Sequence, residues 1–203
     1  LKYFILGSFS SGLLLFGISI IYGTVGTTNF ENLSLLFAGS NEVLVNLESS
    51  IIIGLVFISA AFFFKIAAAP VHMWSPDVYE GAPTSITSYF AVVPKVAGLA
   101  VLIKFMLIPF SKILMEWQTI IIFISIASMI LGAVAAIGQK NIKRLLAYSS
   151  IGHIGYALAG VATGVISGYE SSIVYISIYV VMNLGAFSCL YLSLIHISEP
   201  TRP

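Results

Sequence analysis

Six apolar segments dominate the sequence, and each is about as long as a helix that crosses a lipid bilayer. A helix needs roughly 20 apolar residues to span about 30 Å of hydrocarbon. Lipid offers no hydrogen bonds, so backbone groups must pair within each segment, which favours helices over open strands. Only 8% of the residues are charged, against roughly 25% in a typical soluble domain. We therefore expect an all-α polytopic membrane protein, with spans at 3–23, 51–74, 84–110, 118–137, 145–164 and 171–191.

Composition also argues against several kinds of binding site. A net charge of +1 provides no basic footprint for nucleic acid. The single cysteine, Cys189, rules out a disulfide framework and a thiolate-bound iron–sulfur cluster within the chain. No G-x-G triplet occurs, so the turn that binds a dinucleotide in Rossmann folds is missing. We expect this chain to hold no cofactor, no metal ion and no catalytic residue.

Both ends of the sequence indicate a fragment of a longer protein. Leu1 is not an initiator methionine, and the chain runs directly into an apolar segment. Residues 192–203 resemble one translated frame of an adapter used in sequencing libraries; the alternative is a natural polar cap on the last helix. We therefore treat 1–191 as a partial transmembrane domain and expect 192–203 to lie outside its fold.

Positive charge in the loops predicts the orientation of the helices, because lysine and arginine concentrate in cytoplasmic loops. Only Lys112 falls in a loop on one side of the predicted spans. Four cations fall on the other side: Lys2, Lys140, Lys143 and Arg144. That second side is therefore expected to face the cytoplasm or the matrix, and the acidic loop 24–50 is expected to face outside.

The second apolar segment contains a lysine close to a proline. Lys65 lies about 21 Å along a helix that starts at Ile51, short of the roughly 30 Å needed to leave the hydrocarbon. The span must then continue through Pro70, which lacks an N–H and whose ring clashes with the preceding turn, so we expect a break or kink there. Such a break is tolerated only where it packs in protein or lines a wet cavity. The sequence thus predicts a lysine beside a broken helix inside the membrane.

A second lysine, Lys95, lies about 16 Å into the third segment, directly after Pro94. A lysine at the bilayer centre costs at least about 2.5 kcal/mol on insertion scales, so two of them need a reason. A low dielectric disfavours the ammonium form, so buried lysines can gain and lose protons, which indicates proton transfer. The structural alternative is an ion pair, but none of the six segments contains an Asp or Glu. An acidic partner would have to come from elsewhere.

Other polar residues are candidates for the same path. His72 follows Pro70 and either relays protons or caps the free carbonyl groups of a broken helix. Lys143 begins the fifth segment and either anchors the topology or controls proton uptake. His153, farther along that segment, is better explained as a hydrogen-bonded core histidine than as part of a wet channel. We retain His72 and Lys143 as candidates.

Three runs of sequence resemble one family of membrane proteins. The longest is FKIAAAPVHMWSPDVYEGAP over 64–83, and the others are Pro94-Lys95 and NIKRLLAYSSIGH over 141–153. They resemble the subunit N family of bacterial NADH:quinone oxidoreductase, or respiratory complex I, whose mitochondrial member is called chain 2. The similarity extends over essentially all of 1–191.

This resemblance implies an antiporter-like fold of about fourteen helices, with inverted repeats and broken helices near the midplane, of which the chain holds about six. Lys65 then corresponds to the broken-helix lysine of the family and Lys95 to the lysine of the next helix. Lys143 and Lys2 match further lysines of the pattern. Two other charged positions of the family, an acid on an earlier helix and a lysine on a later broken helix, fall outside this chain.

The resemblance further implies a proton-translocating subunit that couples electron transfer in other subunits to pumping through buried lysines. NADH, FMN, iron–sulfur clusters and quinone would be bound by those other subunits, so the chain would belong to a translocase without holding a redox centre. Its partners would be other membrane subunits of complex I, the lipid bilayer and protons. Its location would be the bacterial inner membrane, with the mitochondrial inner membrane as the alternative.

Two other functions compete with this one. A subunit of a stand-alone multisubunit cation/proton antiporter resembles it in the broken-helix lysines, but the acidic turn at 74–81 favours the subunit N family. A purely structural membrane scaffold is disfavoured, because it would gain stability if Lys65 and Lys95 were replaced by leucine.

Overall fold

All regular structure is helical in a computed structural model of the protein, which describes residues 1–38 and 42–198. Five of the six predicted apolar segments lie largely within one long helix each, the segment 51–74 is divided, and shorter helices connect the long ones. The elements are α1 (Lys2–Val25), α2 (Phe30–Ala38), α3 (Glu42–Lys65), α4 (Trp74–Gly81), α5 (Thr84–Leu107), η1 (Ser111–Ile113), α6 (Leu114–Ile137), α7 (Ile142–Ala162) and α8 (Ile166–Ser198).

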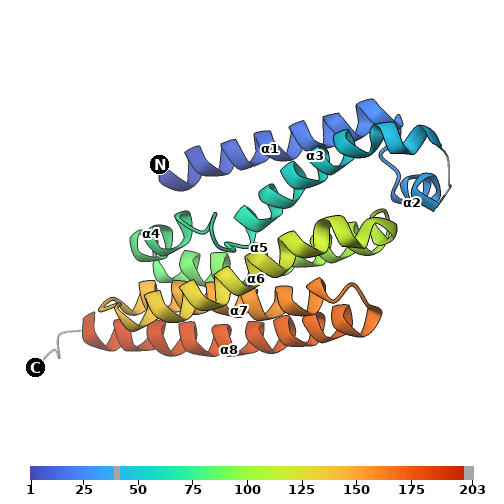
Figure 1. The fold of residues 1–203 in the computed structure, drawn as a ribbon. Coiled ribbons are helices and arrows are strands. Elements are labelled where there is room, and N and C mark those ends of the chain that lie inside the picture. Colours follow the sequence, from blue (N-terminus) through green and yellow to red (C-terminus); the bar gives the residue numbers. More distant parts are fainter. Residues whose placement is uncertain (39–41, 199–203) are drawn as a thin grey trace, which may run out of the picture.

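Five of these helices are long and apolar enough to cross a membrane: α1, α5, α6, α7 and α8. Within the part of α3 whose side chains the structure describes, the apolar stretch covers Ser49–Lys65. The long helices lie alongside one another, with α4 at one end of the bundle and α2 at the opposite end (Figure 1). The predicted all-α membrane fold is therefore confirmed.

Three of the loop cations meet at the α4 end of the bundle. Lys2 and Arg144 form ion pairs with Asp77 of α4, and Lys143 donates to the carbonyl of Ala82, directly after α4. These three cations therefore gather at one end of the bundle, as expected if they share one side of the membrane. That this side faces the cytoplasm remains a prediction.

Two predicted boundaries in the first half of the chain are wrong. The span 51–74 is not one helix, because α3 ends at Lys65 and helical structure resumes only at Trp74. The predicted loop 24–50 is largely helical, since it contains α2 and the start of α3. A side-chain cap stabilises the start of α2. The Asn29 carboxamide oxygen accepts a hydrogen bond from the backbone N–H of Glu31 at 2.8 Å, which satisfies a free amide at the helix start.

The last helix continues past the predicted end of the domain. α8 extends to Ser198, so it includes the first part of the segment 192–203 that resembles an adapter. Residues 199–203 lie outside the described residues. The foreign origin of 192–203 remains a prediction.

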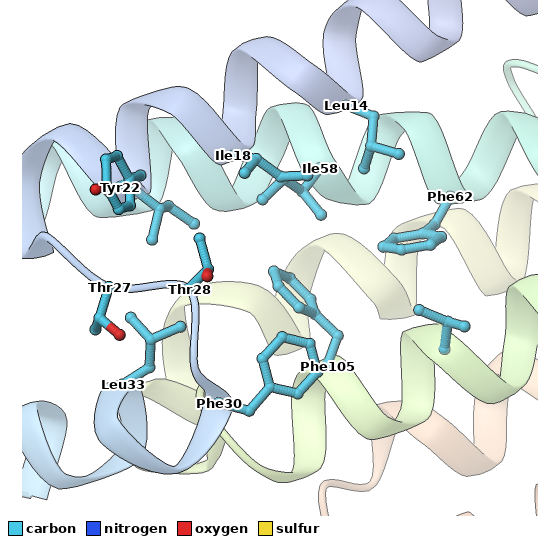
Figure 2. Close-up of a pocket in the computed structure, with 12 residues that line it drawn as sticks. Leu14, Ile18, Tyr22, Thr27, Thr28, Phe30, Leu33, Ile58, Phe62 and Phe105 are labelled. Carbon is cyan, nitrogen blue, oxygen red and sulfur yellow. The ribbon is translucent and has the colours of Figure 1, made fainter.

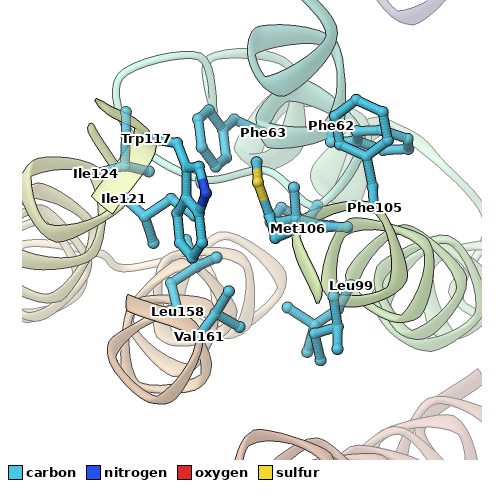
Figure 3. Packing of buried hydrophobic residues seen from close by; sticks show 14 of the residues in the cluster. Phe62, Phe63, Leu99, Phe105, Met106, Trp117, Ile121, Ile124, Leu158 and Val161 are labelled. Carbon is cyan, nitrogen blue, oxygen red and sulfur yellow. The ribbon is translucent and has the colours of Figure 1, made fainter. Parts of the chain in front are cut away.

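The hydrophobic core lies where α3, α5, α6 and α7 meet. Trp117 of α6 is buried between Phe63 of α3, Met106 of α5 and Leu158 of α7 (Figure 3). Its indole N–H donates to the carbonyl of Phe110 at 2.9 Å, so burial of this large side chain leaves no polar atom unpaired.

A cavity of about 240 Å³ lies beside this core, between α1, α2, α3 and α5. Ile18, Ile58, Phe62 and Phe105 point into it, with the Thr28 hydroxyl at one edge (Figure 2). Because most of its lining is apolar, it offers no convergent set of groups that could bind or move a proton. The candidate functional site lies elsewhere.

Glycines let neighbouring helices approach until their backbones touch. A Cβ added at Gly132 of α6 would lie 2.5 Å from the amide nitrogen of Gly152 in α7. A Cβ added at Gly17 of α1 would lie 2.7 Å from the carbonyl oxygen of Gly54 in α3. Small residues serve this purpose in membrane helices, where close packing replaces the hydrophobic effect as the force that joins them.

We expect Gly132→Ala to destabilise the protein by about 1–3 kcal/mol, because the new methyl group meets backbone atoms that cannot rotate away. Thermal denaturation of the full-length subunit in its complex measures this. Gly138→Ala at the end of the same helix is the control, since a Cβ there meets no described atom within 4 Å. Equal melting temperatures for the two variants would contradict the packing described here.

Candidate functional site

Helix α3 ends at Lys65 because the next residues form a left-handed helix termination. Ala67 has φ 59°. The N–H of Ala67 bonds to the carbonyl of Phe64 at 3.0 Å, and that of Ala68 bonds to the carbonyl of Phe63 at 2.8 Å. This is the Schellman arrangement, in which a residue with positive φ lets the chain turn back over the last carbonyl groups. The break therefore begins at Ile66, four residues before Pro70.

Two side chains from other parts of the chain hold this break in place. The Trp74 indole N–H donates to the carbonyl of Phe64 at 2.8 Å. The buried Ser128 hydroxyl on α6 accepts the N–H of Ala69 at 2.9 Å. Since an unpaired backbone group buried away from water is costly, these two contacts help to make a break at membrane depth possible.

Lys65 occupies the last position of α3, where the negative end of the helix dipole favours a cation. Its side chain is exposed on the α1 side, where it lines a cavity of about 460 Å³ together with Tyr3, Ser8 and Ser10. Among the side chains that the structure describes, no carboxylate is paired with it. The structure thus places Lys65 in a partly polar cavity at the break, as the sequence predicted.

Lys95 is fully buried on α5, and its contacts are with uncharged groups. Its ammonium donates to the Ser150 hydroxyl of α7 at 2.5 Å, and Ser150 in turn donates to the carbonyl of Ala147 at 2.6 Å. The Lys95 nitrogen lies 5.6 Å from the ring centroid of Tyr79, within range of a cation–π interaction. Among the described residues, no carboxylate compensates this buried cation.

Pro94 does not end α5, which continues as a helix to Leu107. Without an N–H, Pro94 leaves the carbonyl of Phe90 without its helical partner, and the Tyr79 hydroxyl donates to that carbonyl at 3.4 Å. The Tyr179 hydroxyl of α8 donates to the adjacent Ala91 carbonyl at 3.3 Å. Tyrosines from α4 and α8 are thereby drawn towards Lys95.

His153 lies one turn beyond Ser150 on α7 and is hydrogen-bonded, as the sequence favoured. Its Nδ1 lies 2.8 Å from the Tyr175 hydroxyl of α8, and its ring centroid lies 5.3 Å from that of Tyr179. The tyrosines at 79, 175 and 179 were missed in the sequence because they lie on helices far apart in the chain. In the sequence, only Pro94, next to Lys95, indicates that a backbone carbonyl group has lost its hydrogen-bond donor.

The other predicted site residues do not join Lys65 and Lys95. Half-buried His72 lies within the break, with its ring centroid 6.4 Å from that of Tyr148. None of the hydrogen bonds found among the described residues links it to either lysine. Lys2 and Lys143 lie at the α4 end of the bundle instead.

A cluster of charges at that end joins α1, α4 and α7. Asp77 pairs with Lys2 and, at 3.1 Å, with Arg144. Glu80 pairs with Arg144 at 2.9 Å and accepts the Asn141 amide at 3.0 Å. The hydrogen bond from Lys2 outweighs desolvation and holds the pKa of the Asp77 carboxyl below its usual range. The cluster therefore carries both charge signs and ties α4 to two helices that are remote in sequence.

Comparison with known proteins agrees with this geometry. Residues 1–202 match a family model described as NADH:quinone oxidoreductase/Mrp antiporter, transmembrane. NADH-quinone oxidoreductase subunit N of Pelagibacter ubique is 58% identical over 190 residues, and that of Paramagnetospirillum magneticum is 53% identical over 188. These alignments cover 94% and 93% of this chain but 39% of each relative, so the chain spans well under half of their length.

Two solved structures share the fold. Respiratory complex I from Thermus thermophilus with bound aureothin has a TM-score of 0.75 at 31% identity, over 93% of this chain and 39% of that one. The Mrp complex from a Dietzia species has a TM-score of 0.81 at 22% identity, over 92% of this chain and 33% of that one. At 22% identity, the similarity to the Mrp complex concerns the fold alone.

A long helix that ends at Lys65, followed by the buried Lys95 of α5, thus belongs to a transmembrane protein of the antiporter type. The chain belongs to the NADH:quinone oxidoreductase/Mrp antiporter family. The resemblance to subunit N is confirmed by the relatives, which are subunits of an oxidoreductase complex. With bacterial relatives and membrane-length helices, the predicted location in a bacterial inner membrane is confirmed as well.

We expect Ser150→Ala to destabilise the protein by about 1.5–3 kcal/mol, because a charged donor loses its acceptor. Thermal denaturation of the assembled complex measures the loss, and Ser150→Thr, which keeps a hydroxyl, is the control. The loss should largely disappear in a Lys95→Met background, where no ammonium needs an acceptor. An equal loss in both backgrounds would mean that Ser150 acts independently of Lys95.

Proposed function

We propose that the chain is part of a proton-translocating membrane subunit of NADH:quinone oxidoreductase, and that protons move by way of Lys65 and Lys95. The observation that carries this proposal is the fully buried Lys95, held by neutral groups, together with Lys65 at the end of α3, where the helix breaks. A protein that only needed stability would gain by replacing such a lysine with an apolar residue.

The environment of Lys95 suits a group that changes its charge. Ser150 stabilises the ammonium as a hydrogen-bond acceptor, whereas full burial favours the neutral amine. A positive charge on Lys65 repels one on Lys95, and this repulsion is large where water is excluded. Protonation of one lysine therefore favours release of a proton from the other.

Such transfer requires a driving reaction, because moving a proton against 100 mV costs about 2.3 kcal/mol. We propose that electron transfer in other subunits of the complex supplies this energy. Those subunits would bind NADH, FMN, iron–sulfur clusters and quinone, while this chain contributes the proton path. The enzyme is then the whole complex, and its other membrane subunits and the surrounding lipid are the partners of this chain.

The charge cluster at the α4 end suits proton uptake. Asp77 and Glu80 are carboxylates near the surface of the bundle, and Lys2 and Lys143 lie beside them. Surface carboxylates are able to take up protons from water; in this cluster Lys2 keeps Asp77 ionised, so we assign uptake to Glu80. His72 lies between this cluster and Lys65 along the chain, where it can pass protons into the break.

An antiporter of the Mrp type is the second candidate, supported by the match to its fold. Identities of 58% and 53% with subunit N relatives favour the complex I function.

We expect Lys65→Ala in the full-length subunit to reduce proton pumping by roughly tenfold or more, the equivalent of about 1.4 kcal/mol or more. Acidification of inverted membrane vesicles driven by NADH measures pumping, and the amount of assembled complex is measured alongside. Lys104→Ala is the matched control, because Lys104 is an exposed lysine near the far end of α5. Normal pumping by assembled Lys65→Ala would refute the proposal.

We expect Lys95→Arg to lose most pumping although it keeps the positive charge. Arginine stays protonated in proteins and so cannot release a proton as lysine does. The same vesicle measurement is compared with NADH oxidation by the variant. Pumping at the wild-type rate would show that Lys95 serves as a fixed charge.

A further inference from the structure

The break at 66–73 lies directly against α5 at one glycine. A Cβ added at Gly98 would lie 2.7 Å from Cγ2 of Ile66 and 3.9 Å from Cβ of Lys65. Carbon atoms in contact prefer separations of about 3.5–4.0 Å. Because Gly98 has no side chain, α5 lies about 1 Å closer to the break than a residue with a Cβ would allow.

Gly98 also lies on the face of α5 that carries Lys95. The two residues are three positions apart, and residues at this spacing are neighbours on a helix surface. Gly98 and Lys95 are both buried. The contact between Gly98 and the first residue of the break thus lies between the two lysines of the proposed path.

We propose that Gly98 is a positioning residue, which sets the spacing of Lys65 and Lys95 by letting the break lie against α5. This inference rests on the proposed function, because the spacing matters only if the charge on one lysine influences the other. Their interaction depends on distance and on the exclusion of water.

Ile66 cannot easily move aside to admit a methyl group. It is fully buried, and a β-branched side chain has few rotamers to choose from. The clashing Cγ2 is attached to Cβ, so rotation at the end of the side chain does not remove it. A methyl group at Gly98 therefore displaces the break itself, together with the adjacent Lys65.

Ser128 holds the same segment from the α6 side. Its hydroxyl accepts the N–H of Ala69, three residues beyond Ile66. The break is thus fixed between a steric contact on α5 and a hydrogen bond on α6, and removal of either one should let Lys65 shift relative to Lys95.

The test compares proton pumping with NADH oxidation in inverted vesicles that contain the full-length subunit in its assembled complex. We expect Gly98→Ala to lower the number of protons moved per NADH by at least about twofold, while NADH oxidation continues. Ile66→Ala removes the clashing methyl group, so Gly98→Ala combined with Ile66→Ala should regain most of the lost ratio. Gly23→Ala is the control, because a Cβ there meets no described atom within 4 Å.

A wild-type ratio in Gly98→Ala would overturn the inference, and so would a double variant as impaired as the single one. Ser128 provides a test that adds no atoms to the contact: Ser128→Ala should lower the ratio, and Ser128→Thr, which keeps the hydroxyl, should preserve it. Equal ratios for these two variants would also overturn the inference. The two proposals can fail separately. If Lys65→Ala loses pumping and Gly98→Ala does not, only the positioning role of Gly98 is refuted. If Lys65→Ala pumps normally, the proposed function is refuted.

Discussion

A helix that ends inside a membrane frees backbone groups that lipid cannot satisfy, and much of this structure is arranged around that problem. Ala67 turns the chain so that the amides of residues 67 and 68 bond back to α3. Trp74 donates to a carbonyl of the last turn, and Ser128 accepts an amide of the break. These contacts bring α4 and α6 to the end of α3 and thereby place Lys65.

The same physical constraint explains the surroundings of Lys95. Pro94 removes one donor from α5, and the tyrosines that approach the freed carbonyl of Phe90 and the adjacent carbonyl of Ala91 come from α4 and α8. Buried Lys95 therefore lies against the Tyr79 ring and the Ser150 hydroxyl. Both lysines lie where a helix has lost regular backbone hydrogen bonds. The side chains that replace those hydrogen bonds create a polar region within an apolar bundle, and this region holds the lysines.

Much of the fold could be predicted from the sequence, since the length of each apolar segment is fixed by the thickness of the bilayer. Lys65 and Lys95 stood out because charge is rare in such segments. The position of the break could not be predicted, because a left-handed termination usually carries glycine and here carries Ala67. Ser128 and Ser150 gave no signal either, since one serine in an apolar helix looks the same whether or not it meets a partner.

The anchors of the break are made later than the break itself. Trp74 and Ser128 of α6 hold the break itself, and Arg144 of α7 holds α4 next to it; all three follow residues 66–73 in the chain. During synthesis, α3 therefore reaches the bilayer before the helices that hold its end. Until they arrive, the free amide and carbonyl groups near Lys65 need water or other temporary partners. Chain order thus delays the final placement of Lys65 until α6 and α7 have been inserted, and the central lysine is among the last parts of α3 to become fixed.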